Sequence, residues 1–165
     1  MFRSPTTRTK PHIRGFTLVE MLAVVTIVGI LAAAAQPLSV WMNKRHKEGE
    51  LRQGLRTLRL ALDAYKQASV NGQIVVAADA SGYPPNLNAL VEGVPDAKDP
   101  KGRKIYFLRR LPRDPLADPG LPAARSWGLR SYDSPADAPQ PGRDVFDVYS
   151  QASGIGLDGT RYRDW

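Results

Sequence analysis

The pattern of hydrophobic and polar positions divides the chain into two unlike halves. Residues 16–35 read FTLVEMLAVVTIVGILAAAA, an apolar run whose only charge is Glu20. Further on, apolar side chains recur three or four positions apart, as on one face of a helix that packs against a core: Leu51, Leu55, Leu58, Leu62 and Tyr65. The pattern predicts one helix from about residue 16 to 69, bent at Pro37. Asn71-Gly72 would end it, because both residues tolerate left-handed backbone.

The second half of the chain predicts short elements joined by proline-rich loops, since 11 of the 14 prolines follow residue 80. The expected fold class is α+β, with a long N-terminal helix packed on a small antiparallel β-sheet. Its expected segments are a short strand or extended link at 74–78, a helix at 86–91 capped by Asn86, an ambiguous apolar and basic segment at 105–111, a loop at 112–122, strands at 127–132 and 145–149, and a third extended segment at 159–165.

Charged residues beside the apolar stripe form two pairs of opposite sign at i,i+4 spacing, Glu48–Arg52 and Arg59–Asp63. We expect both pairs on the solvated face of the helix, where each contributes a few tenths of a kcal/mol. The stripe itself is expected to contact the core of the following domain.

The apolar run is long enough to be a membrane helix, because a bilayer core is spanned by roughly 20 apolar residues. We therefore predict a transmembrane and assembly helix at 16–40 and a globular part at 41–165. The residues before it carry four basic side chains and no acid, which favours a cytoplasmic position for that end: Arg3, Arg8, Lys10 and Arg14. A carboxylate in such a helix costs a few kcal/mol, so Glu20 is a candidate functional residue.

The stretch Gly15-Phe16-Thr17-Leu18-Val19-Glu20 resembles the type IV prepilin signal. The resemblance implies that a prepilin peptidase removes residues 1–15 by cutting after Gly15 and that the new N-terminal Phe16 is methylated. It also implies that Glu20 pairs with the terminal amine of a neighbouring subunit. Within one chain, the Phe16 amine would lie four residues before Glu20 on the same helix face, and in a packed bundle Glu20 could also reach the Phe16 amine of the next chain. In apolar surroundings the pair could set the axial register between subunits.

Two other readings of the N-terminus compete with this one. An ordinary secretory signal peptide would be cut near residues 32–35, a run of four alanines. Glu20 would interrupt its apolar region, however, and the helical pattern continues beyond the alanines. An uncleaved membrane anchor is the third reading.

Composition narrows the classes of function. There is no cysteine, which excludes the disulfide that closes the C-terminal loop of many pilins. The net charge of +7 is no nucleic-acid footprint, because four of the positive charges belong to the leader and 19 basic residues then face 16 acidic ones. The only histidines are His12 in the leader and His46 just beyond the apolar run, so we expect no enzyme.

Motifs in the second half resemble those of the major, G-type pseudopilin of type II secretion systems. Their order along the chain also agrees: Tyr83-Pro84, Leu111-Pro112-Arg113-Asp114-Pro115, Phe146-Asp147-Val148-Tyr149-Ser150, Asp158-Gly159 and Asp164-Trp165. The resemblance implies a structural subunit of a periplasmic pseudopilus in a Gram-negative bacterium, single-pass in the inner membrane before it polymerises with identical and related pseudopilins. The implied partners are the prepilin peptidase, an inner-membrane secretion platform and a cytoplasmic ATPase.

The chain departs from that family in three places. Leu116-Ala117 stands where the family has Trp-Gly, and an insertion of prolines and small residues then precedes Trp127. The C-terminal loop is also short and poor in acid. In the family this loop carries calcium, which prefers six to eight oxygen ligands. The candidate calcium ligands here are Asp158, Asp164 and Ser150. The alternative is that both aspartates are surface carboxylates beside Arg161 and Arg163.

Two alternative functions remain open at the level of sequence. One is a minor pilin or pilus-type subunit of a related machine that binds a ligand such as DNA. Arg109, Arg110 and Arg113 form the candidate basic patch, although an ordinary solvated face is the favoured explanation of these arginines. The other is a periplasmic binding module exported by a cleaved signal peptide.

Overall fold

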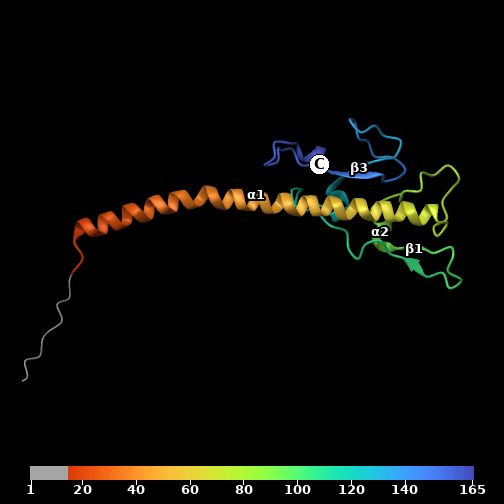
Figure 1. Cartoon of the computed structure of the whole chain (residues 1–165), viewed down its shortest axis with the longest axis horizontal. Helices are drawn as coiled ribbons and strands as arrows, with labels where there is room; N and C mark the ends of the chain where they lie inside the picture. Colours follow the sequence, from red (N-terminus) through yellow and green to blue (C-terminus); the bar gives the residue numbers. More distant parts are fainter. Residues whose placement is uncertain (1–14) are drawn as a thin grey trace, which may run out of the picture. The chain divides into compact units, whose positions relative to one another are not determined.

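The computed structural model describes residues 15–165, apart from the side chains of residues 34–38. The chain divides into two compact units, Met1–Met42 and Asn43–Trp165, and the helix α1 (Leu18–Val70) contributes to both (Figure 1). The predicted leader therefore lies outside the described residues, except for Gly15. The α+β architecture expected from the sequence is confirmed, with one long helix and small antiparallel sheets.

The C-terminal end of α1 is set by local sequence, as predicted. Gly72 has a φ of 70°, the left-handed conformation that glycine adopts without steric cost. Its N–H donates to Ser69 O and the next N–H, of Gln73, donates to Ala68 O, both at 2.9 Å. These two bonds form a Schellman motif, which satisfies carbonyls that the end of a helix leaves without partners. Within the helix, α1 is continuous through residue 37, so the proline does not end it.

The core of the second unit lies where the apolar stripe of α1 meets the rest of the domain. Leu51, Leu55, Leu58, Leu62 and Tyr65 are all buried, which confirms the stripe. Buried side chains from the later segments pack against them: Ile74, Leu87, Leu90, Trp127, Val145, Val148 and Tyr162. Gly54 lies on the same face of α1, directly against the Trp127 ring. A Cβ at this position would stand only 3.1 Å from the ring, so the helix leaves room for Trp127 by having no side chain there.

Two short antiparallel sheets flank this helix, and Figure 1 draws them on opposite sides of the α1 ribbon. The first pairs β1 (Val94–Pro95) with β2 (Lys104–Ile105). The second pairs β3 (Trp127–Arg130) with β4 (Asp147–Ser150), with Gly128 opposite Tyr149. The remaining elements are the helix α2 (Ala89–Glu92) and the 3-10 turns η1 (Ala123–Arg125) and η2 (Tyr162–Asp164).

Several predicted segments differ in detail from the structure. The predicted strands at 127–132 and 145–149 are confirmed as β3 and β4, and the loop at 112–122 is confirmed. Residues 74–78 form no strand, and the ambiguous segment at 105–111 gives only the end of β2. The third extended segment at 159–165 is wrong beyond one bridge between Ile155 and Arg161, because η2 turns the chain there. The helix predicted at 86–91 begins later, at Ala89, whose N–H donates to Asn86 Oδ1 at 3.1 Å.

The prediction that the two i,i+4 charge pairs lie on the solvated face is wrong. Glu48 is buried, and Arg52 pairs with Asp158 instead, at 2.5 Å. Arg59 pairs with Asp147 at 2.8 Å rather than with Asp63. In each case a segment about a hundred residues away offers the charged group a partner that the helix alone does not.

Candidate assembly helix and C-terminal loop

The helix α1 begins with a capping arrangement at Thr17. Its hydroxyl oxygen accepts a hydrogen bond from Glu20 N at 3.2 Å, which satisfies one of the amides that the first turn leaves without a partner. Thr17 and Glu20 thus have the Thr-x-x-Glu spacing of a capping box, and a carboxylate in the first turn also favours the positive end of the helix dipole. Our sequence reasoning missed Thr17, although this spacing just before an apolar run was the signal for it.

The start of α1 exposes large apolar side chains. Phe16 is 71% exposed, and the residues that follow it on the helix resemble it: Leu18, Val19, Met21, Leu22, Val24, Val25, Ile27, Val28, Ile30 and Leu31. An apolar surface this extensive marks a site of interaction with other helices or with lipid. Cleavage after Gly15, methylation of Phe16 and pairing through Glu20 stay predictions, because they concern a processed chain and its neighbour.

Among the residues that the structure describes, no helix is both long enough and apolar enough to cross a membrane. The membrane span predicted at residues 16–40 therefore has no support in the structure.

At its other end, the chain closes on α1 through what we call the C-terminal loop, residues 151–165. Glu48, buried on α1, accepts hydrogen bonds at Oε1 from Leu157 N at 3.0 Å and from the Tyr162 hydroxyl at 2.9 Å. Burial and the Glu48 carboxylate together raise the pKa of Tyr162 to about 12. The phenol therefore stays a donor at any physiological pH. Glu48 is a residue whose role the sequence did not reveal.

The candidate calcium ligands are each engaged elsewhere. Asp158 Oδ1 accepts from the N–H and the hydroxyl of Thr160, and its Oδ2 pairs with Arg52. Hydrogen bonds from Thr160, with a smaller contribution from Arg52, hold the pKa of Asp158 below its ordinary value. Asp164 is exposed and faces Arg163 at 4.0 Å.

Ser150, the third candidate, belongs to a buried network at the end of β4. Its hydroxyl donates to Asp114 Oδ2 at 2.6 Å, and both residues are fully buried. Leu116 N donates to the other carboxylate oxygen at 2.8 Å, and Asp114 N donates to Ser126 Oγ at 3.1 Å. A buried carboxylate needs such partners, so this network fixes the segment 111–115 against β4.

These positions do not fit a calcium ion, which requires several free oxygen ligands around one point. Within the described part of the chain, no three His, Cys, Asp or Glu side chains form a group that could hold a metal. Arg52 also places a positive charge against the Asp158 carboxylate. Calcium binding thus stays a prediction from the sequence, without support from this geometry.

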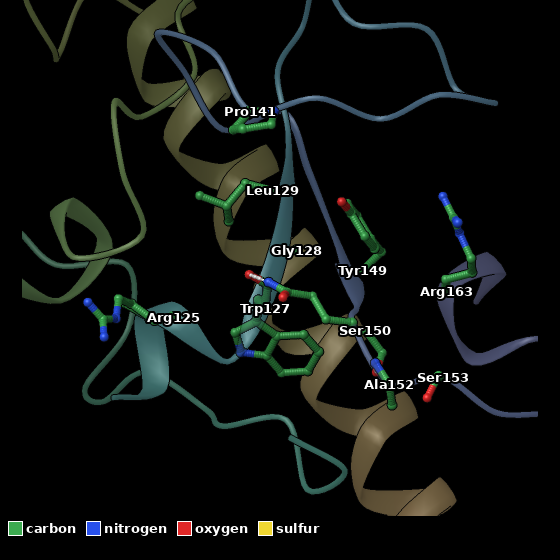
Figure 2. A pocket seen from close by; sticks show the side chains of 12 residues that line it. Arg125, Trp127, Gly128, Leu129, Pro141, Tyr149, Ser150, Ala152, Ser153 and Arg163 are labelled. Atoms are coloured by element: carbon green, nitrogen blue, oxygen red, sulfur yellow. Dashed lines mark hydrogen bonds between the residues drawn. The ribbon is translucent and has the colours of Figure 1, made fainter. Parts of the chain in front are cut away.

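A surface hollow of about 670 Å³ lies over the β3–β4 sheet (Figure 2). Figure 2 shows Trp127 and Gly128 on β3 beside Tyr149 on β4, with Arg125 and Arg163 on opposite sides of them. The Tyr149 ring covers the Gly128 backbone, because a Cβ there would stand 2.3 Å from the ring. Packing between side chains of the two strands therefore shapes the hollow. The Ser150 hydroxyl, which also lines it, donates to the buried Asp114 carboxylate.

The remaining candidates from the sequence are surface groups. Arg109, Arg110 and Arg113 line an open hollow of about 710 Å³ beside α1, and Arg113 donates to the main-chain oxygen of Asp118. The three arginines therefore lie together on one part of the surface. His46 is exposed and lies 3.2 Å from Glu50, one turn away on α1.

Comparisons with known proteins agree with the features described above. Residues 10–36 match the family described as the prokaryotic N-terminal methylation motif. The type II secretion system core protein G of Pseudomonas aeruginosa is 31% identical over 150 residues, which cover 88% of this chain and 84% of that protein. The protein of the same name from Vibrio cholerae is 30% identical over 149 residues, covering 88% and 81%.

A second kind of relative matches a shorter stretch of the chain. The type IV major pilin protein PilA of Myxococcus xanthus is 41% identical over 58 residues, 35% of this chain and 26% of the pilin. No solved structure matches the chain. Since a relative at 31% identity is matched over most of both lengths, the chain belongs to the family of the type II secretion system core protein G.

Proposed function

We propose that this chain is the structural subunit of a pseudopilus, the periplasmic filament with which a type II secretion system exports proteins. The observation that carries the proposal is the family membership, which rests on a match over 88% of this chain, together with the methylation motif at residues 10–36. The exposed apolar start of α1 supports it, because a polymer of such helices would bury that surface.

Apolar burial alone would not give the polymer a register. Lipid tails are as apolar as leucine, so moving the helix from lipid to a bundle of helices gains little from the hydrophobic effect. A charged group among these side chains is costly unless it is paired. We therefore assign the choice of register to Glu20, which pairs with the Phe16 amine of the preceding subunit after Gly15 and the residues before it are removed.

The location and partners follow from the same proposal. Type II secretion pseudopilins are proteins of the cell envelope, and we place this chain in the inner membrane with residues 43–165 in the periplasm. That location rests on the family and on the basic leader, and not on a membrane-spanning helix in the structure. The proposed partners are a prepilin peptidase, identical and related pseudopilins, and the inner-membrane platform.

We also propose that the subunit has no catalytic activity and does not need nucleic acid. The only histidine among the described residues, His46, is exposed and faces Glu50, and Ser150 donates to a buried carboxylate. Both groups are thus placed for structural roles.

The first test is the intact mass and N-terminal residue of the protein extracted from membranes. A chain that begins at Phe16 with one added methyl group is the expected result. A chain that begins near Gln36 would contradict the proposal, because the start of α1 would be missing from the mature protein.

The second test compares two glutamates of α1. Glu20→Gln should leave processing intact and abolish cross-linkable filaments and export, because the amide cannot neutralise the Phe16 amine. Glu50→Gln is the matched control, since Glu50 is also an exposed acid on α1, and it should assemble normally. Normal filaments from the Glu20→Gln variant would refute the assigned role of Glu20.

A further inference from the structure

Polar side chains of α1 reach the C-terminal loop at intervals of one helical turn. Lys44, Glu48 and Arg52 are spaced four residues apart, so they lie on one face of the helix. Lys44 Nζ donates to Ile155 O at 2.9 Å, and Glu48 accepts from Leu157 N. Each side chain contacts a position further along the loop than the one before it.

Arg52 makes two contacts at once. One nitrogen of its guanidinium donates to Asp158 Oδ2 at 2.5 Å, and the guanidinium carbon lies 4.2 Å from the centroid of the Trp165 ring. A planar, permanently charged guanidinium can pair with a carboxylate and stack on an aromatic face at the same time, which an ammonium does less well.

The loop is also closed on itself around Thr160. The Thr160 hydroxyl donates to Asp158 Oδ1 at 2.6 Å and accepts from Trp165 Nε1, also at 2.6 Å. Gly156 N donates to Thr160 O at 2.7 Å. The two groups that Arg52 contacts, Asp158 and Trp165, are thus joined to each other through one side chain.

We propose that Arg52 is an arginine latch that holds the C-terminal loop on α1 without a metal ion. Both oxygens of the Asp158 carboxylate are taken, and the cation beside them is a fixed guanidinium. A loop carbonyl that could have been a ligand, that of Ile155, already accepts from the Lys44 ammonium. A divalent cation at Asp158 would have to displace the Arg52 guanidinium and approach the Lys44 ammonium. Repulsion between like charges therefore disfavours a cation at this site.

The inference concerns the stability of the subunit and does not depend on the proposed function. It would hold equally if the chain assembled into another kind of filament. Its failure would appear in the isolated chain, whereas failure of the proposed function would appear in processing, assembly or export.

The first experiment measures the thermal midpoint of the full chain in detergent, with EGTA or with millimolar CaCl₂. We expect the two midpoints to coincide. A higher midpoint with CaCl₂, reversed by EGTA, would overturn the proposal, because the loop would then use calcium.

The second experiment measures amide hydrogen exchange across residues 155–165 in two arginine variants. Arg52→Gln should speed exchange in this segment by about tenfold relative to the unmodified chain, since it loses an ion pair and a cation–π contact together. Arg56→Gln, one turn further along α1, is the matched control and should leave the segment unchanged. CaCl₂ should not restore protection to the Arg52→Gln chain.

A third variant keeps the test decisive. Asp158→Asn weakens the ion pair with Arg52, so it should speed exchange in the same segment, and the effect of the double variant should be smaller than the sum of the two single changes. Exchange that is equal in the Arg52→Gln and Arg56→Gln chains would overturn the latch, as would full additivity of the Arg52 and Asp158 changes.

Discussion

The hydrogen bond between Tyr162 and Glu48 offers a sharp test of how the C-terminal loop is held. The two residues lie 114 positions apart in the chain, both are 6% exposed, and the hydroxyl lies 2.9 Å from Glu48 Oε1. Tyr162→Phe removes only the hydroxyl. The ring keeps its edge-on contact with Trp165, at 5.1 Å between centroids.

The expected loss follows from the burial of the acceptor. A hydrogen bond to a charged group contributes about 1.5–3 kcal/mol, and the partner left behind cannot be fully solvated. Glu48 keeps the bond from Leu157 N, so we expect a decrease of about 2 kcal/mol in the free energy of unfolding. With a urea dependence of about 2 kcal/mol per M, the midpoint should fall by about 1 M.

The assay is urea unfolding of the full chain in detergent, followed by near-ultraviolet circular dichroism. Tyr65→Phe is the matched control. Tyr65 is also a buried tyrosine, but the described residues supply no hydrogen-bond partner for its hydroxyl. Its removal should change the free energy of unfolding by no more than about 0.5 kcal/mol. Equal midpoints for the Tyr162→Phe and unmodified chains would refute the reasoning.

The same bond predicts a dependence on alkaline pH. The pKa of Tyr162 rises from 10.0 to about 12 in the folded chain. A raised pKa means that the phenol's contribution is complete below pH 10.0, its unfolded value, and is lost as the pH rises through the folded value. The difference in stability between the unmodified and Tyr162→Phe chains should therefore shrink as pH increases from 10.0 to about 12. A difference that stays constant across this range would contradict the assigned pKa.

Three further predictions concern the core and the second sheet, each read out by urea unfolding. Leu58→Ala should cost about 2–5 kcal/mol, because the side chain is fully buried. Gly128→Ala should cost about 1–3 kcal/mol by pressing a Cβ into the Tyr149 ring, and Tyr149→Ala should relieve part of that cost. Burial raises the pKa of Asp144, but hydrogen bonds, including that from Ser131 Oγ, outweigh it and lower the pKa below 3.8. This contribution is present above pH 3.8 and lost as the pH falls through the folded value, so the advantage over Asp144→Asn should disappear in acid.

The long helix and its core face could be predicted from the sequence alone. The spacing of Leu51, Leu55, Leu58 and Leu62 is a property of neighbouring residues, because positions three and four apart share a helix face wherever the helix lies. Asn71-Gly72 ends the helix for an equally local reason, since glycine alone enters the left-handed region without strain. The order of the short motifs was likewise sufficient to identify the family.

The small elements of the second half were decided by tertiary structure. A strand of two residues, such as β1, carries no alternation that a sequence could display. Residues 159–165 looked extended, yet η2 turns them so that Tyr162 reaches the core and Glu48. The conformation of this segment is decided by the burial of the Tyr162 ring in the core, which the segment's own preference for extended backbone does not reveal.

The charged residues show the same division most clearly. The sequence could state that Glu48 and Arg52 stand one turn apart and that helices favour such pairs. It could not state that a loop more than a hundred positions away would bury one and pair with the other. The local sequence determines which residues share a face of the helix, because the helical backbone fixes the angle between successive side chains. The partner of each polar group on that face is chosen only when distant segments pack there, because a buried charge must find a partner wherever the fold supplies one.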